Sequence, residues 1–204
     1  MTDTSSMGQP MPSEFKVVIA GIGGQGVVFA TRILATAALA WGRPVVACET
    51  HGMSQRGGSV LSHLRLGGGE APLLRQGTAD VLLAFDLAEG LRALPYLRPG
   101  GVAFADNDGS YPTELEAPLS SRRLRIHCLP ARRIAEDGGS KAAANVVIIG
   151  AASAHPDWLI PMDALRAAVA KLSGRSTDQN LRALDAGYQA FASSQAQLTR
   201  PEVA

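Results

Sequence analysis

Short apolar runs alternate with longer segments of helical periodicity along most of this chain. The first run, Phe15 to Ala20, precedes helix-like spacing from Val27 to Trp41, and a second run spans Pro44 to Cys48. Uninterrupted apolar runs of this length are typical of strands buried on both faces of a parallel sheet. The repeated order of strand, helix and strand predicts an α/β fold. We expect a Rossmann-like, doubly wound sheet, mainly parallel or mixed, with helices on both faces.

Similar patterns continue toward the C-terminus. The mixed pattern of Val60 to Leu66 suits an antiparallel or edge strand. Further strands are predicted at Asp80 to Asp86, Val102 to Ala105 and Arg122 to Leu129, the first two separated by a helix from Leu87 to Leu94 and by closing residues Leu97 to Gly101. Three more helices are predicted at Ser140 to Ala154, Met162 to Leu172 and Asp178 to Phe191, with Asp163 and Asp178 as N-caps.

Length and composition predict a single domain. At 204 residues and 46% hydrophobic content, the chain can bury one sizeable core. Ser, Thr, Gly and Pro are frequent in residues 1–14, so we expect a disordered extension there, and the polar residues 193–204 predict a flexible tail. The domain therefore spans residues 15–192.

Charge and cysteine content exclude several classes of function. The 19 basic and 18 acidic residues leave a formal net charge of +1, which argues against nucleic acid or a membrane surface as partner. The chain lacks 18 consecutive apolar residues and a signal-peptide pattern. Cys48 and Cys128 are far apart in the sequence, so we expect no metal site, no cluster held by this chain alone, and reduced thiols in a cytoplasmic protein.

The strongest local motif lies between the first predicted strand and helix. Gly21, Gly23 and Gly26 have the GxGxxG spacing. N–H groups at a helix start lack intrahelical partners and the helix dipole is positive there, so such a turn is typical of a phosphate site. Glu49 follows the next strand, where a Rossmann domain would bind a ribose hydroxyl. The residues alone predict a dinucleotide-binding domain; a tight turn without a ligand is the alternative.

Other polar residues occur where strands end or where helices are otherwise apolar. Thr50 to Val60 forms an unusually long polar loop, which suggests a binding surface. Asp86 and Asp106 follow predicted strands, at the edge where open α/β sheets bind ligands, although each could instead be an N-cap or turn residue. Asn145 interrupts an apolar helix, so it is either a hydrogen-bonding anchor in the core or a ligand contact.

Four segments together resemble a known family: GIGGQG at 21–26, ETHGMSQRGGSV at 49–60, ADVLLAFD at 79–86 and AANVVIIGA at 143–151. They are similar to the γ-type subunits of 2-oxoacid:ferredoxin oxidoreductases, and most similar to the indolepyruvate ferredoxin oxidoreductase β subunits. The likeness covers about Phe15 to Phe191. The HGMSQRGG segment favours the indolepyruvate branch, because pyruvate-type subunits usually carry a YGxExRGG-like loop there.

The resemblance implies a heteromeric enzyme that oxidatively decarboxylates an aryl-2-oxoacid to its acyl-CoA and passes two electrons to ferredoxin. Thiamine diphosphate, Mg²⁺ and iron–sulfur clusters would be held by a large partner subunit, and the chain would be inactive alone. This chain would shape the part of the active site that faces coenzyme A and the partner. Stand-alone NAD-dependent oxidation remains the alternative, and a pure assembly module is a third.

The resemblance also assigns roles to residues. The backbone N–H groups of Gly23, Gly24, Gln25 and Gly26 would contact phosphate or the partner backbone, beside Gly21, Gly57, Gly58 and Asn145. Arg56 would donate to a CoA phosphate or to a partner carboxylate. His51 would handle or orient a proton near the thiamine. Alternatively, His51 and Arg56 form a structural network with Glu49 and Gln55, which would remove Glu49 from ribose binding.

Overall fold

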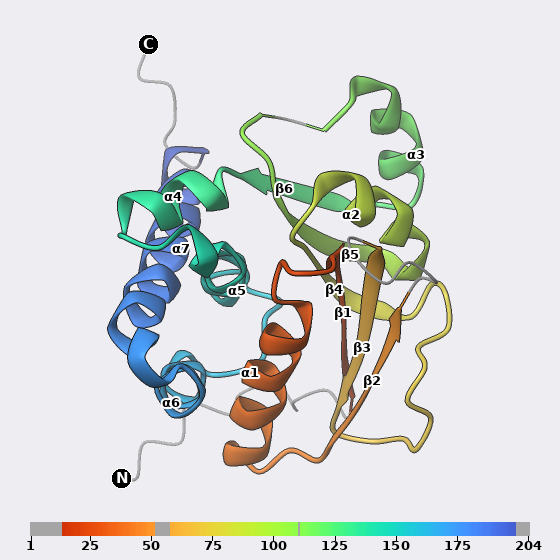
Figure 1. Cartoon of the computed structure of the whole chain (residues 1–204). Helices are drawn as coiled ribbons and strands as arrows, with labels where there is room; N and C mark the ends of the chain where they lie inside the picture. Colours follow the sequence, from red (N-terminus) through yellow and green to blue (C-terminus); the bar gives the residue numbers. More distant parts are fainter. Residues whose placement is uncertain (1–13, 52–57, 110, 199–204) are drawn as a thin grey trace, which may run out of the picture.

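One twisted sheet forms the centre of the molecule. The computed structural model describes residues 14–51, 58–109 and 111–198. Within them, six strands form one sheet in the order β2-β3-β1-β4-β5-β6 (Figure 1). The strands are β1 (Phe15–Ile22), β2 (Val45–His51), β3 (Ser59–Leu66), β4 (Ala79–Ala84), β5 (Leu97–Asp106) and β6 (Arg125–Leu129).

The sheet is mixed because of β3. Strand β3 lies between β2 and β1 and is antiparallel to both, whereas β1, β4, β5 and β6 pair in parallel. The antiparallel alternative for this segment is confirmed, and the edge alternative is wrong. Its polar residues suggested an edge, but Ser62 and His63 are buried, and the Ser62 hydroxyl accepts a hydrogen bond of 2.8 Å from Thr31.

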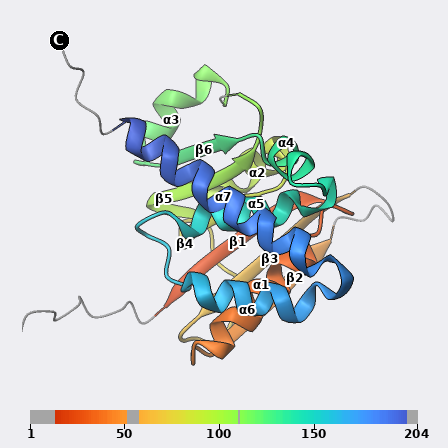
Figure 2. The ribbon, with the colours of Figure 1, turned by 90° about the vertical axis from the view of Figure 1, so that its left-hand side faces the viewer.

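Helices cover both faces of the sheet, as the sequence predicted (Figures 1 and 2). The larger layer consists of α1 (Val27–Ala40), α4 (Ala131–Asp137), α5 (Ala144–Ser153), α6 (Met162–Leu172) and α7 (Thr177–Leu198). The smaller layer consists of α2 (Leu87–Ala93) and α3 (Glu116–Ser121). Short turns of 3₁₀-helix are η1 (Leu94–Tyr96), η2 (Thr113–Leu115), η3 (Lys141–Ala143) and η4 (Gly174–Ser176). None of the described helices combines the length and apolar character that a membrane crossing requires.

The central strand β1 contributes side chains to two hydrophobic cores, one on each face of the sheet. Val17 and Ile19 belong to the larger core, under α1, α5, α6 and α7, while Val18 and Ala20 belong to the smaller core, under α2 and α3. All four side chains are almost completely buried. Because successive side chains of a strand point to opposite faces, burial of both sets explains the unbroken apolar run in the sequence.

Helices α5 and α7 meet through their backbones. A Cβ added at Gly150 would overlap the carbonyl oxygen of Leu184, and one added at Gly187 would overlap that of Val147. The two glycines therefore let the helices approach more closely than side chains would allow. Figure 2 shows the resulting arrangement, in which α7 crosses over α5 and extends toward β6.

Several boundaries differ from the prediction. Strand β5 begins at Leu97, so the residues expected as a closing turn belong to the strand. Helices α3 and α4 were not predicted, because six or seven residues are too few to show a helical period. Helix α7 continues to Leu198, beyond the expected domain end at residue 192. Asp163 and Asp178 lie inside the first turns of α6 and α7, so the N-cap prediction is wrong.

The N-terminal boundary is close to the expected one. Residues 1–13 lie outside the described residues, while Glu14, assigned to the extension, forms ion pairs with Lys16 at 2.7 Å and Arg65 at 3.0 Å. These contacts attach the start of β1 to β3.

Candidate functional site

The glycine-rich segment forms a tight turn between β1 and α1. Gly26 is the N-cap of α1 with φ of +82°, a left-handed conformation that favours glycine. The backbone N–H of Gln25 donates to the carbonyl of Ile22 at 3.0 Å, and the side-chain Oε1 of Gln25 accepts from the Ile22 N–H at 2.8 Å. Gln25 therefore stabilises the turn through both its backbone and its side chain. This structural role explains why the position holds a residue larger than a dinucleotide-binding loop requires.

A hollow of about 490 Å³ opens beside this turn. It lies past the carboxyl ends of β1, β4 and β5, which is where open α/β sheets bind ligands. The turn, α1, α4, η3 and α5 all contribute to its wall. The lining residues are Gly24, Gln25, Gly26, Phe29, Phe85, Asp106, Arg132, Lys141, Ala142, Ala144, Asn145 and Ile148.

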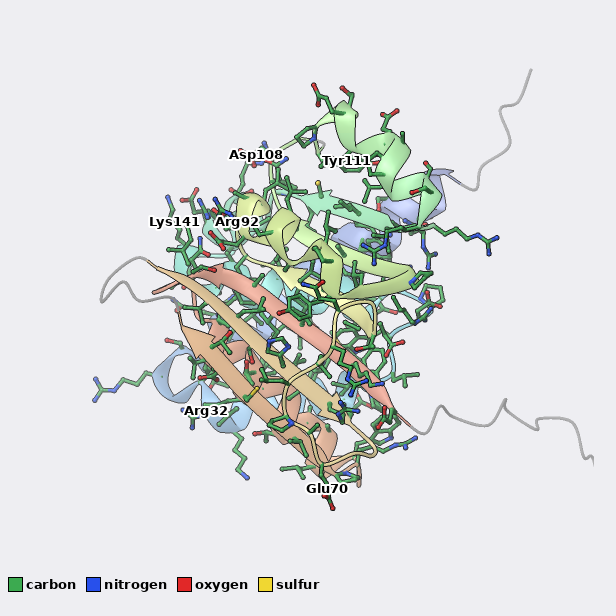
Figure 3. All side chains as sticks on the ribbon, turned by 90° about the vertical axis from the view of Figure 1, so that its right-hand side faces the viewer. Arg32, Glu70, Arg92, Asp108, Tyr111 and Lys141 are labelled. Atoms are coloured by element: carbon green, nitrogen blue, oxygen red, sulfur yellow. The ribbon has the colours of Figure 1, made fainter. Side chains whose placement is uncertain are left out.

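Two basic side chains line this hollow, and each is paired with an acidic one. The Nε of Arg132 lies 2.9 Å from Oδ2 of the buried Asp106, and the backbone N–H of Arg132 donates to the same carboxylate. Burial raises the pKa of Asp106, although the neighbouring Arg132 opposes that rise. Lys141 is exposed and pairs with Glu136 at 2.7 Å. Figure 3 shows Lys141 and Asp108 toward the same end of the molecule, opposite Glu70, and both line a polar hollow next to this one.

The start of α1 adds further hydrogen-bond donors. No side chain caps this helix and its first turn contains no acidic residue. The first N–H groups of an uncapped helix, together with the positive end of its dipole, favour an anion. Together with Arg132 and Lys141, they suit a phosphate-bearing ligand that also has an apolar part for Phe29 and Phe85.

Asn145 anchors the turn and also lines the hollow. Its Nδ2 donates to the carbonyl of Gly26 at 3.2 Å, and its Oδ1 accepts from the Val146 N–H at 2.8 Å. The side chain is buried. Asn145 is therefore a hydrogen-bonding anchor between the turn and α5. Because it also lies in the wall of the hollow, direct contact with a ligand stays a prediction.

The two aspartates at strand ends have different roles. Asp86 is the N-cap of α2 and accepts from the Glu89 N–H at 3.1 Å, so its structural interpretation is the one observed. Asp106 lies in the wall of the hollow and pairs with Arg132.

The end of the long polar loop joins the glycine turn. The N–H of Gly23 donates to the carbonyl of Gly58 at 2.9 Å, and Gly21 is in register with Val60 across the β1–β3 pair. The loop therefore contacts the glycine turn at Gly58, and the predicted binding role of Gly58 stays a prediction. Arg56 and Gly57 lie outside the described residues, as does the side chain of His51, so their predicted roles stay predictions.

Glu49 does not lie where a Rossmann ribose-binding carboxylate would lie. Because β3 is inserted between β2 and β1, Glu49 is two strands from β1, roughly 10 Å sideways at ordinary strand spacing. It is in register with Ser62, which pairs with Ile19, so it lies level with the body of β1. Glu49 does not line the hollow. The prediction of Glu49 as a ribose ligand is therefore corrected.

Sequence reasoning missed Arg132, Lys141, Phe29 and Phe85. Arg132 lies on helix α4, which was not predicted. This helix follows β6 in the chain and contributes Arg132 to the wall of the hollow. Lys141 could have been found, since it lies at the start of the helix predicted at Ser140 to Ala154, four residues before Asn145.

The described residues do not form a metal-ligand cluster. No three His, Cys, Asp or Glu side chains come together within them. Cys48 and Cys128 are free, half-buried thiols on β2 and β6, the two edge strands of the sheet, and burial raises the pKa of both. At usual strand spacing these edges are roughly 24 Å apart, so the two thiols do not fit one iron–sulfur cluster.

Comparison with known proteins identifies relatives over most of the chain. The family model for pyruvate ferredoxin/flavodoxin oxidoreductase matches residues 16–190. The indolepyruvate oxidoreductase subunit IorB of Archaeoglobus fulgidus is 34% identical over 186 residues, covering 84% of this chain and 92% of that protein.

Solved structures share the fold at lower identity. The γ subunit of a keto/oxoacid ferredoxin oxidoreductase from Geobacter sulfurreducens superposes with a TM-score of 0.70 at 24% identity, covering 88% of this chain and 99% of that one. A 2-oxoglutarate:ferredoxin oxidoreductase from Magnetococcus marinus, with 2-oxoglutarate, coenzyme A and succinyl-CoA bound, gives a TM-score of 0.72 at 22% identity. That match covers 90% of this chain and 32% of the longer one.

Proposed function

Because this chain belongs to the pyruvate ferredoxin/flavodoxin oxidoreductase family, we propose that it is the non-thiamine subunit of an enzyme specific for aryl-2-oxoacids. The complete enzyme would decarboxylate an indolepyruvate-like substrate oxidatively, form its acyl-CoA and reduce ferredoxin. The similarity to an indolepyruvate oxidoreductase subunit supports the aryl preference, as does the HGMSQRGG segment at 51–58.

The hollow beside the glycine turn carries this proposal. Coenzyme A has a pyrophosphate and a 3′-phosphate, which require donors and positive charge, together with a flat adenine. The start of α1, Arg132 and Lys141 supply the donors, while Phe29 and Phe85 supply apolar surface. The 2-oxoglutarate:ferredoxin oxidoreductase from Magnetococcus marinus, of which this chain matches 32%, was solved with coenzyme A bound, which supports coenzyme A as a ligand of the complete enzyme. In this role the chain binds and orients the thiol substrate.

The remaining chemistry would belong to a large partner subunit. Thiamine diphosphate would supply the group on which decarboxylation occurs, and iron–sulfur clusters would pass the electrons to ferredoxin. The described residues of this chain do not fit a cluster, which supports that division. The alternative of a stand-alone NAD-dependent oxidoreductase loses its main support with the corrected position of Glu49.

Reconstitution tests the proposal. We expect neither this chain nor the large subunit alone to reduce ferredoxin with indolepyruvate, and their mixture to do so only when coenzyme A is present. Calorimetric titration of the complex should show tighter binding of coenzyme A than of dephospho-CoA, which lacks the 3′-phosphate, and weaker binding of NADH. Turnover by the isolated chain, or a preference for NADH, would contradict the assignment.

A further inference from the structure

Among the residues that the structure describes, strand β6 has a partner strand on one side only and forms an edge of the sheet. It is the last strand in the sheet order and pairs with β5. The carbonyl of Leu129 accepts from the Asn107 N–H at 3.0 Å, on the β5 side. Because successive residues of a strand direct their backbone groups to opposite sides, those of Ile126 and Cys128 point toward the open edge. This edge therefore offers N–H and C=O groups to a further strand.

A second hollow, of about 420 Å³, runs along this edge. Five consecutive residues, from Ile126 to Pro130, line it. The first four of them belong to β6, and successive side chains of a strand point to opposite faces of the sheet, so the hollow follows the strand edge. Tyr111, labelled in Figure 3, lines one side, and Ala190, Phe191, Ser194 and Gln195 of α7 line the other. It shares no lining residue with the hollow beside the glycine turn.

The floor of this second hollow is aromatic and uncharged. His127 stacks edge-on against Phe191, with ring centroids 4.9 Å apart, and also packs on Phe104 at 5.2 Å. Its Nε2 is buried without a hydrogen-bond partner. Burial, with His155 and Arg125 nearby, lowers the pKa of His127 to about 4, so the ring is neutral at physiological pH. The hollow therefore suits apolar side chains.

Positive charge lies at the start of the same strand. Arg123 is exposed two residues before the start of β6, and the side chain of Arg125 is 51% exposed while it pairs with Asp157 at 2.7 Å. An apolar groove beside an open strand edge, with arginines at one end, is complementary to an extended peptide that carries a carboxylate.

We propose that an extended segment of the large partner subunit docks on the open edge of β6, with apolar side chains in the hollow and a carboxylate beside Arg123 and Arg125. Backbone pairing with Ile126 and Cys128 supplies affinity, and the hollow between Tyr111 and α7 supplies specificity. The pairing also covers an edge that would otherwise promote association with other strands. This inference rests on the proposed function in that it requires the large subunit as partner.

Two neighbouring serines on α7 provide a matched test. Ser193 and Ser194 are both exposed, but only Ser194 lines the hollow. Ser194→Trp should fill the groove and weaken the affinity for the large subunit at least tenfold, whereas Ser193→Trp should leave it unchanged. Arg123→Glu should also weaken the affinity for the large subunit, and the loss should be larger at low salt than at high salt. Equal affinities of the two tryptophan variants would overturn the proposal.

Hydrogen exchange of the wild-type proteins gives an independent readout. The amides of Ile126 and Cys128 should exchange rapidly in the free chain and become protected in the complex. A complex that forms while these amides remain unprotected would overturn this inference and leave the proposed function intact, whereas failure to bind any large subunit would overturn both. Protection in the free chain would also overturn it. If the amides are protected in the free chain and deletion of residues 199–204 removes that protection, the groove is occupied by the chain's own tail. If their protection instead increases with the concentration of the free chain, the groove is occupied by a second copy.

Discussion

The side-chain amide of Asn145 donates a hydrogen bond to the carbonyl of Gly26, across 119 positions of sequence. This contact joins the start of α5 to the start of α1, so the two helices that border the hollow are held in one arrangement. It also places Asn145 where a Cβ on residue 26 would lie. The glycine turn and the helix facing it therefore constrain each other.

Replacement of Gly26 should be more damaging than replacement of Gly24. Both have positive φ, so alanine costs roughly 1–2 kcal/mol of backbone strain at either position. At Gly26 the new Cβ would also displace Asn145, while at Gly24 it meets open space. Urea unfolding should show Gly26→Ala losing about 1–3 kcal/mol more than Gly24→Ala, the cost of leaving a buried polar group unpaired. Equal losses would show that the Asn145 contact is unimportant for stability.

The backbone contact between α5 and α7 gives a second prediction. Alanine usually stabilises a helix interior relative to glycine by about 1 kcal/mol. Gly150→Ala and Gly187→Ala should do the opposite and lower the midpoint of thermal unfolding, because each Cβ would overlap a carbonyl of the other helix. Once one substitution has separated the helices, the second should cost less, so the double variant should be less damaging than the sum. A stabilised Gly187→Ala variant would contradict the close approach.

Gln25→Glu should separate folding from ligand binding. The carboxylate can still accept the hydrogen bond from the Ile22 N–H, and a negative charge at a helix start is favourable by about 0.3–1 kcal/mol. Thermal stability should therefore be unchanged or slightly raised. The same charge would repel a phosphate in the hollow, so the affinity for coenzyme A should fall about tenfold or more in a calorimetric titration. Unchanged affinity would place the phosphates elsewhere.

The buried histidines predict a dependence of stability on pH. The pKa of His127 is lowered from 6.5 to about 4, and burial also lowers those of His63 and His155. Below 6.5 the unfolded chain binds protons that the folded chain does not, so stability is complete above pH 6.5 and falls as the pH drops toward 4. His127→Phe should reduce this slope by up to about one proton in urea unfolding measured across pH. An identical slope would show that His127 is protonated normally in the fold.

Local sequence signals predicted the parts of the site that depend on local structure. The glycine spacing fixed the turn between β1 and α1, and the apolar run before it identified β1 as a strand buried on both faces. Asn145 was singled out because an amide in an apolar helix requires partners, and the structure provides them.

Long-range pairing explains what the sequence did not reveal. The insertion of β3 between β1 and β2 depends on pairing between distant segments, and it moved Glu49 away from the expected ribose site. Arg132 was missed because its helix has seven residues, too few for a periodic pattern. The close approach of α5 and α7 was missed for another reason, because two isolated glycines in the sequence do not indicate that they face each other in the fold.

Steady-state kinetics of the reconstituted enzyme test the central claim most directly. Lys141 lines the hollow, while Lys171 is an exposed lysine in the last turn of α6. In ferredoxin reduction with indolepyruvate, Lys141→Gln should raise the KM for coenzyme A several-fold and leave the KM for the oxoacid unchanged, whereas Lys171→Gln should alter neither. A KM for coenzyme A that is the same in both variants and the wild type would contradict the assignment of this hollow to coenzyme A.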